Sequence, residues 1–182
     1  MKFSETFIKD VYIIEPGIFK DDRGYFYESY NQKLFKESDI DAEFIQDNQS
    51  MSQKGALRGL HAQAPPKAQG KLVRVIQGRV LDVAVDIRKN SPTYGKHVSI
   101  QLSGDNHKML WVPPGFLHGF LTLEDDTIFS YKVTNLYEKN AEIGVSWNDP
   151  DLNINWEINL DEVILSEKDK QLPLLKDLAS PF

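Results

Sequence analysis

Apolar and polar residues alternate with a period of two through the middle of this 182-residue chain. Three segments show the pattern clearly: residues 81–86, 98–102 and 128–134. In the first of these, Leu81, Val83 and Val85 fall on one side of an extended strand, with Asp82, Ala84 and Asp86 on the other. An amphipathic helix would instead repeat its apolar residues at intervals of three and four. The pattern therefore predicts that β-strands form the centre of the protein.

Short clusters of turn-forming residues separate the predicted strands at intervals of about 8–12 residues, a spacing typical of β-sandwiches and barrels. These clusters are residues 77–78, 90–92, 103–106 and 124–126. Helical patterns are confined to residues 32–38 and to one or two short segments within residues 166–178. Because no repeat, low-complexity tract or linker divides the chain, we expect residues 1–182 to form a single, mainly β domain with short peripheral helices.

Composition excludes several classes of protein. The net charge is −6, which argues against a nucleic-acid-binding face, and no apolar run approaches the roughly 18–20 residues that span a bilayer. Residues 1–7 lack the apolar core of a signal peptide, so we expect a soluble, cytoplasmic protein. The absence of cysteine removes disulfides, thiolate nucleophiles and cysteine zinc sites. Any catalysis must rest on His, Tyr, Lys, Arg and carboxylates.

The four histidines fall into two groups. Glycine and apolar residues flank His61 and His118, and we expect both side chains to point into the folded interior. His97 and His107 lie beside lysines in polar surroundings, which favours the surface. For the two interior histidines, residue pattern alone leaves a hydrogen-bonded core role and a chemical role equally open.

Polar and basic residues gather around His61 in the sequence. Residues 46–50 and Arg58 precede it, and Lys71 and Arg74 follow it. Such groups are costly to bury without a partner, and an anionic ligand such as a phosphate would provide one. A further guanidinium is available from Arg23. The alternative, that each arginine forms a surface ion pair, remains open for any single residue.

The segment Pro113-Pro114-Gly115-Phe116-Leu117-His118 resembles the second half of the cupin barrel signature. Many cupins bind a metal through three histidines and a carboxylate, with a His-x-His pair in the first half of the signature. Here the corresponding segment is His61-Ala62-Gln63, and the chain has no His-x-His pair. We therefore expect no metal site, although two histidines and a carboxylate can bind iron in other proteins.

An ordered set of motifs along nearly the whole chain resembles the dTDP-4-dehydrorhamnose 3,5-epimerases, a family with a cupin-like jelly-roll fold. The matching segments lie at residues 22–26, 46–50, 57–63, 69–74, 82–88, 91–92, 110–120, 131–134 and 165–169. One residue departs from the family pattern: Ala62 occupies a position where members often carry an aromatic residue. That change affects packing beside His61 but removes no group able to transfer a proton.

The resemblance implies epimerisation at C3 and C5 of dTDP-4-dehydro-6-deoxy-D-glucose, on the route to dTDP-L-rhamnose. The C4 ketone acidifies both positions because the carbanion delocalises as an enolate. By the resemblance His61 is the base, Asp169 its carboxylate partner, Tyr131 the acid at C5 and Lys71 the cation beside the enolate oxygen. Neither a redox cofactor nor a metal is expected.

The resemblance also implies a set of substrate-binding residues and a homodimer. The binding set is Arg23, Phe26, Glu28, Gln46, Asn48, Arg58, Lys71, His118, Glu142 and Lys168. Asp82 is expected to orient His118. Strands within about residues 10–30 are expected to pair with the partner subunit, so that Arg23 and Phe26 reach the neighbouring site.

Other readings stay open on sequence alone. Without the resemblance, the residue pattern favours a strand aromatic packed on Phe129 and Val133 for Tyr131, and a solvated carboxylate at a helix end for Asp169. At the level of function, the alternatives are an epimerase acting at one carbon only, a non-catalytic nucleotide-sugar-binding cupin, and a metal-dependent cupin enzyme.

Overall fold

The computed structural model describes residues 1–182, except for the side chain of Leu160. The strands are β1 (Lys2–Glu5), β2 (Tyr12–Glu15), β3 (Phe19–Asp21), β4 (Gly24–Phe26), β5 (Gln46–Ser52), β6 (Leu57–Gln63), β7 (Lys71–Gln77), β8 (Arg79–Asp86), β9 (His97–Ser103), β10 (Met109–Val112), β11 (Phe116–Thr122), β12 (Thr127–Val133) and β13 (Glu142–Gly144). The helices are α1 (Gln32–Glu37) and the 3₁₀ turns η1 (Lys139–Ala141), η2 (Leu160–Glu162), η3 (Asp169–Gln171) and η4 (Leu175–Asp177).

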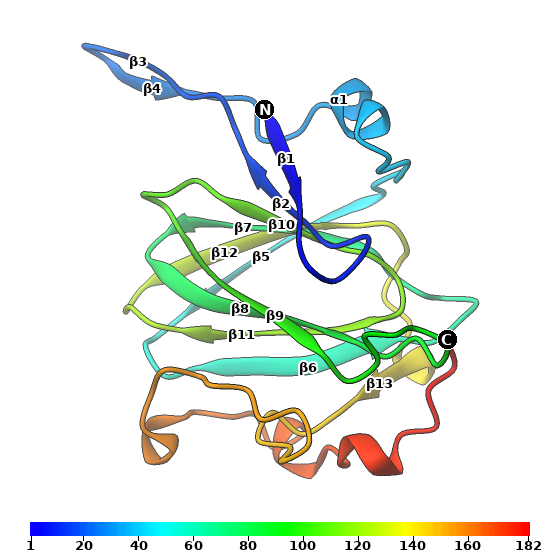
Figure 1. Cartoon of the computed structure of the whole chain (residues 1–182). Coiled ribbons are helices and arrows are strands. Elements are labelled where there is room, and N and C mark those ends of the chain that lie inside the picture. The colour runs from blue at the N-terminus through cyan, green and yellow to red at the C-terminus, as the bar shows by residue number, and fades with distance from the viewer.

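Two antiparallel sheets lie face to face and form a flattened barrel (Figure 1). The first sheet has the strand order β1-β2-β10-β7-β12-β5, and the second has the order β13-β6-β11-β8-β9. Neighbours in the second sheet are mostly distant in sequence, as in β6 paired with β11, so long connections pass between the two sheets. The predicted cupin-like jelly-roll fold is confirmed.

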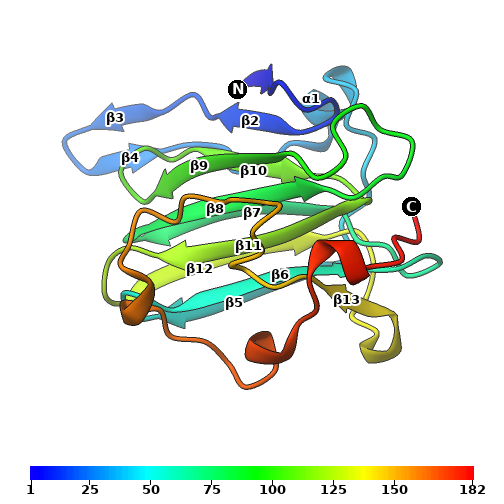
Figure 2. The same ribbon diagram turned by 60° about the horizontal axis from the view of Figure 1, so that its bottom comes forward.

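Both faces of strand β8 are buried, and the alternation of its residues places different side chains on each face. Leu81, Val83 and Val85 face outward and pack beneath the C-terminal segment, which carries the buried indoles of Trp147 and Trp156. This segment, orange to red in Figures 1 and 2, covers the outer face of the second sheet. Leu81, Val83 and Val85 are therefore buried outside the barrel, and Asp82 points inward on the same side of the strand as Val80 and Ala84.

The barrel interior has its own apolar core. Residues from both sheets pack together there, among them Val73, Val98, Leu110, Phe120 and Phe129. A smaller third cluster lies on the outer face of the first sheet, where Phe35 of α1 covers Met109 and Trp111. Burial of apolar surface on both faces of both sheets supplies most of the driving force for folding.

The predicted turns and the first helix are confirmed, but the C-terminal helices are shorter than predicted. Each turn cluster lies between consecutive strands of the structure. Helix α1 begins after Asn31, whose side chain accepts a hydrogen bond from the Leu34 amide. Within residues 166–178 only η3 and η4 form, because packing on the second sheet holds the rest of this segment extended.

The N-terminal region forms two distinct pieces. Strand β2 pairs with β1 and β10 and so completes the first sheet of its own chain. Strands β3 and β4 form a separate two-stranded hairpin, which projects from the barrel (Figures 1 and 2). The hairpin exposes Phe19, Tyr25 and Phe26, each more than half accessible to solvent. Pairing of this region with a partner subunit remains a prediction.

One histidine was assigned wrongly from the sequence. His107 is buried rather than on the surface, and its ring packs against Tyr25 and Tyr27 at centroid distances of 4.8 and 5.1 Å. The residue lies in a turn at a φ of 52°, which directs its side chain away from the flanking polar residues. His97 is half-buried. No helix among the described residues is long and apolar enough to cross a membrane.

Candidate active site

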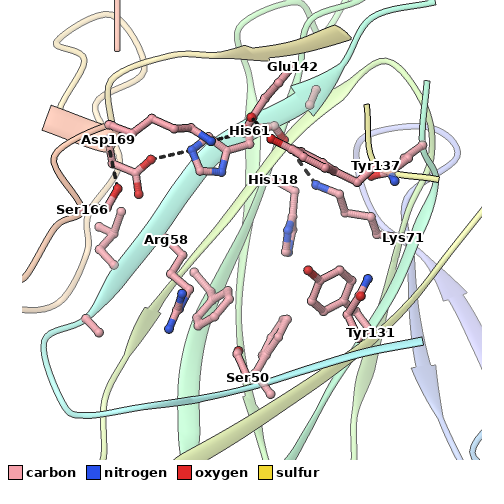
Figure 3. Close-up of a pocket in the computed structure, with 18 of the residues that line it drawn as sticks. Ser50, Arg58, His61, Lys71, His118, Tyr131, Tyr137, Glu142, Ser166 and Asp169 are labelled. Atoms are coloured by element: carbon pink, nitrogen blue, oxygen red, sulfur yellow. Dashed lines mark hydrogen bonds and ion pairs between the residues drawn. The ribbon is translucent and has the colours of Figure 1, made fainter. Parts of the chain in front are cut away.

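A cavity of about 680 Å³ opens between the two sheets, and strands of both contribute side chains to it (Figure 3). It brings together most of the residues that the sequence singled out, although they are spread over more than 120 positions of the chain: Gln46, Asn48, Arg58, His61, Lys71, His118, Tyr131, Glu142, Lys168 and Asp169. Arg23, Phe26 and Glu28 do not line the cavity.

His61 lies on one wall of the cavity and forms a short hydrogen bond with Asp169. The distance from its Nε2 to the Asp169 Oδ1 is 2.6 Å, and the two residues are 108 positions apart (Figure 3). With a carboxylate accepting the Nε2 proton, Nδ1 is left as the basic nitrogen of the ring. The imidazole remains 25% exposed, whereas the carboxylate is 5% exposed. This pair can take up a proton at the cavity surface.

Asp169 is held at the start of η3, with its amide donating to the Ser166 hydroxyl. Burial by itself raises the pKa of this carboxyl, but the hydrogen bond from His61 and the charges around it outweigh that effect and lower the pKa below its ordinary value. Asp169 therefore stays ionised near neutral pH. The alternative of a solvated carboxylate does not fit its burial.

A second histidine–aspartate pair lies deeper in the barrel. The Nε2 of His118 is 3.1 and 3.0 Å from the two carboxylate oxygens of Asp82. These residues belong to the paired strands β11 and β8, and both side chains are almost completely buried. The predicted contact between Asp82 and His118 is present. His118 presents its other ring nitrogen as a fixed hydrogen-bonding group.

Lys71 lies between the two pairs. Its Nζ donates to the main-chain oxygen of His61 at 3.4 Å. Burial lowers the pKa of this lysine to about 8, and the negative charges of Asp82 and Glu142 partly oppose the effect. The ammonium is therefore mostly charged at neutral pH but has little solvent to stabilise it, so an oxyanion in the cavity would be a strong partner.

Tyr131 lies on β12, on the side of the cavity opposite His61 in Figure 3. Its ring packs near Phe129, at a centroid distance of 6.0 Å, as the packing interpretation requires. It also lines the cavity, so packing and a chemical role are compatible. Burial raises the pKa of its hydroxyl, and the charge of Arg58 partly offsets this. The phenol is therefore protonated at neutral pH and can act as a proton donor.

Three polar side chains on β5 and β6, those of Gln46, Asn48 and Arg58, also line the cavity. The Gln46 amide donates to the Asn48 carbonyl oxygen at 2.7 Å, which fixes the orientation of both amides. Arg58, near the start of β6, is exposed toward the cavity opening. In contrast, Arg74 points to the outer face of the first sheet, where it donates to the Tyr27 hydroxyl. Lys71 and Arg74 are three residues apart on one strand, so period-two alternation separates them.

Glu142 and Lys168 form an ion pair at the cavity opening, and the Tyr137 hydroxyl donates to Glu142 at 2.9 Å. Burial raises the pKa of Glu142, but the hydrogen bonds from Lys168 and Tyr137 outweigh that effect and lower it overall. Tyr137 lines the cavity with its ring 59% exposed, and the sequence analysis did not identify it. The sequence signal that could have identified Tyr137 is an aromatic residue three positions after the predicted strand at residues 128–134.

Gln63 is a second residue that the sequence analysis did not single out as functional. Its buried side-chain amide donates to the main-chain oxygens of Lys67 and Leu136, and it accepts from the amide of Glu138. These three bonds tie β6 to the loop that carries Tyr137. Gln63 therefore sets the position of that aromatic ring at the cavity opening.

The three remaining predicted residues lie on or near the projecting hairpin. The Arg23 side chain is 90% exposed and pairs with Asp21, and Phe26 is exposed at the end of β4. Glu28 accepts a hydrogen bond from Asn31. Within a single chain these residues do not join the cavity. In the described part of the chain, no group of three or more His, Asp and Glu side chains is arranged to hold a metal ion.

Comparison with known proteins places this fold and cavity in one family. The family model for dTDP-4-dehydrorhamnose 3,5-epimerase matches residues 5–177. A protein of that name from Methanothermobacter thermautotrophicus is 47% identical over 177 residues, which cover 97% of this chain and 95% of that protein.

Solved structures give the same result. The enzyme of that name from Elizabethkingia anophelis superposes with a TM-score of 0.93 and 50% identity over 97% of each chain. A dTDP-6-deoxy-D-glucose-3,5-epimerase from Legionella pneumophila, solved in complex with dTDP-4-keto-L-rhamnose, has a TM-score of 0.93 and 46% identity over 97% of this chain and 94% of that one. The chain therefore belongs to the dTDP-4-dehydrorhamnose 3,5-epimerase family of isomerases.

Proposed function

We propose that this protein converts dTDP-4-dehydro-6-deoxy-D-glucose into dTDP-4-dehydro-L-rhamnose, by inverting C5 and C3, as a step of dTDP-L-rhamnose biosynthesis. The observation that carries the proposal is the placement of a histidine base with its carboxylate, His61 and Asp169, across one cavity from the protonated phenol of Tyr131. Inversion of a carbon centre needs a base on one face and an acid on the other.

The chemistry begins at the basic Nδ1 of His61. This nitrogen removes the proton from C5, and the electron pair of the C–H bond delocalises through C4 onto the C4 oxygen. Asp169 stabilises the resulting imidazolium through the 2.6 Å hydrogen bond. The ammonium of Lys71 stabilises the enolate oxygen, in a buried position where a charge–charge contact is much stronger than in water.

Tyr131 completes the inversion at C5. Its hydroxyl delivers a proton to the face opposite the base, which restores the ketone and leaves a phenolate. Proton exchange with solvent then returns both Tyr131 and His61 to their starting states. An enolate is basic enough to draw a proton from a phenol with reference pKa of about 10. The same base and the same enolate stabilisation serve the second inversion at C3.

The remaining groups suit the rest of a dTDP-sugar. His118, fixed by Asp82, is placed to bind the sugar ring deep in the cavity. Arg58 and Lys168 supply positive charge for the diphosphate, and Gln46, Asn48 and Glu142 supply polar contacts. The exposed ring of Tyr137 offers a stacking surface for the thymine base.

We further propose that the protein acts as a homodimer in which the β3–β4 hairpin of each chain reaches the cavity of its partner. In a single chain Arg23 and Phe26 are exposed on a projecting hairpin, away from the cavity. Exposed aromatic side chains of this kind favour an interface. Arg23, Phe26 and Glu28 would then complete the substrate site of the other subunit.

The deciding experiment follows the substrate in heavy water by NMR, with no metal or nicotinamide added. The proposal expects deuterium at both C3 and C5 and an L-rhamno product. Exchange at one carbon with a single inverted product would identify a mono-epimerase instead. Tight binding of dTDP without any exchange would identify a binding protein, and dependence of the exchange on added metal would identify a metal enzyme.

A further inference from the structure

A buried serine holds the guanidinium of Arg58. Ser52, the last residue of β5, accepts hydrogen bonds from Nε and Nη2 of Arg58 at 3.2 and 3.1 Å. Ser52 is 6% exposed and Arg58 is the second residue of β6, so the contact joins a strand of the first sheet to a strand of the second. Both bonds come from the same edge of the guanidinium.

The charge of Arg58 is not neutralised by this contact. Among the residues whose side chains the structure describes, Arg58 forms hydrogen bonds only to Ser52, and no carboxylate forms an ion pair with it. Arg23 and Arg88, in contrast, are each paired with an aspartate. A guanidinium has five N–H donors, so three remain free on the side that faces away from the serine. Arg58 is also one of the residues that line the cavity.

We infer that Ser52 is a positioning residue, which orients the Arg58 guanidinium toward the diphosphate of the nucleotide sugar without cancelling its charge. The inference rests on the proposed function, because it takes the ligand to be a nucleoside diphosphate sugar. An aspartate at this position would hold the arginine more firmly but would compete with the phosphates. A hydroxyl is neutral and accepts the two bonds that fix the long side chain, so less side-chain freedom is lost when the ligand binds.

The test compares Ser52→Ala with the unmodified protein. We expect the variant to bind dTDP about tenfold more weakly by calorimetry, and to bind thymidine equally well, since only the phosphates contact Arg58. In turnover, KM should rise by a similar factor and kcat should change little. Ser103→Ala is the matched control, because Ser103 is also buried and accepts a main-chain hydrogen bond but belongs to β9, away from the cavity. It should affect thermal stability without affecting dTDP affinity.

A double-mutant cycle separates positioning from direct contact with the ligand. In an Arg58→Ala background, Ser52→Ala should add less than about a twofold further loss of dTDP affinity, because the group it positions is gone. With Arg58 present, Ser52→Thr keeps the hydroxyl and should retain most of the dTDP affinity of the unmodified protein. If Ser52→Ala is as costly in the Arg58→Ala background as alone, or weakens thymidine and dTDP equally, the inference is wrong.

Failure of the inference and failure of the proposed function give different results. If the unmodified protein neither binds dTDP nor exchanges substrate protons, the proposed function fails. If the unmodified protein binds dTDP tightly and Ser52→Ala binds it just as tightly, only the role of Ser52 is refuted. If Ser52→Ala folds poorly, the dTDP affinities of Ser52→Thr and Arg58→Ala still distinguish failure of the inference from failure of the proposed function.

Discussion

The two histidine–aspartate pairs in the cavity contain the same chemical groups, but they are built differently. His118 and Asp82 lie on adjacent strands of one sheet, and both side chains are almost inaccessible to solvent. His61 also lies on a strand, but its partner Asp169 comes from a 3₁₀ turn of the C-terminal segment that packs across the sheet, and its ring is 25% exposed. A ring that must gain and lose protons needs access to substrate and solvent, whereas a ring that orients a sugar needs only a fixed position.

Lys71 connects the two pairs. It donates to the main chain of His61, and the charge of Asp82 helps to keep it protonated. In the proposed function, the exposed pair transfers protons, the buried pair orients the sugar, and the lysine between them stabilises the enolate. Four predictions test that division.

Replacing each histidine in turn should give the largest difference in activity between the two pairs. His61→Asn removes the base, and we expect kcat to fall by about 10³–10⁴-fold with dTDP affinity nearly unchanged. His118→Asn keeps a hydrogen-bonding group in the sugar site, so a loss of about tenfold is expected. Steady-state kinetics and solvent-deuterium exchange measure both. Equal losses in the two variants would show that the division is wrong.

Asp169→Asn tests the role of charge in the exposed pair. The amide oxygen can still accept from the Nε2 of His61, so geometry is kept, but the imidazolium loses its counter-charge. We expect kcat to fall by about 10²-fold with little change in KM. A variant with unchanged kcat would mean that Asp169 has only a structural role.

Asp82→Asn should affect stability more than Asp169→Asn does. Its carboxylate is fully buried, and both oxygens lie within hydrogen-bonding distance of the same His118 nitrogen. Asparagine keeps one acceptor, but it removes the charge and places a buried NH2 group close to the same nitrogen, which should cost about 2–4 kcal/mol and lower the Tm of a chain of this size by about 5–10 °C. Differential scanning calorimetry of the two asparagine variants makes the comparison directly. The ranking fails if Asp169→Asn is the less stable protein.

The pH dependence of the rate tests the lysine between the pairs. Because the pKa of Lys71 is lowered to about 8, the ammonium loses its proton as the pH rises through that value, and kcat/KM should fall on the alkaline side. The negative charge of Asp82 raises this pKa, so Asp82→Asn should move the alkaline limb to lower pH, whereas Asp169→Asn should leave it in place. Lys71→Arg should abolish the limb, since arginine stays protonated. A limb that persists in Lys71→Arg would have to be assigned to another group.

The fold class and most of the cavity-lining residues can be predicted from the amino-acid sequence. Period-two alternation specified strands, and turn residues specified where they end, because both signals are local. His61, Lys71, His118 and Tyr131 all lie on strands, where alternation decides which side of the sheet each residue faces. Their roles came from resemblance to a family and remain predictions.

Which functional groups contact one another depends on the packing of the whole chain. Asp169 looked like a solvated carboxylate from its neighbours Lys168 and Lys170, and packing of the C-terminal segment buries it against a strand 108 positions away. His107 looked like a surface residue, and a left-handed turn buries it between two tyrosines. Ser52 and Arg58 are only six positions apart, but they lie on strands of different sheets, and the packing of the two sheets brings their side chains together. Such contacts depend on long-range packing, which local periodicity and composition do not encode.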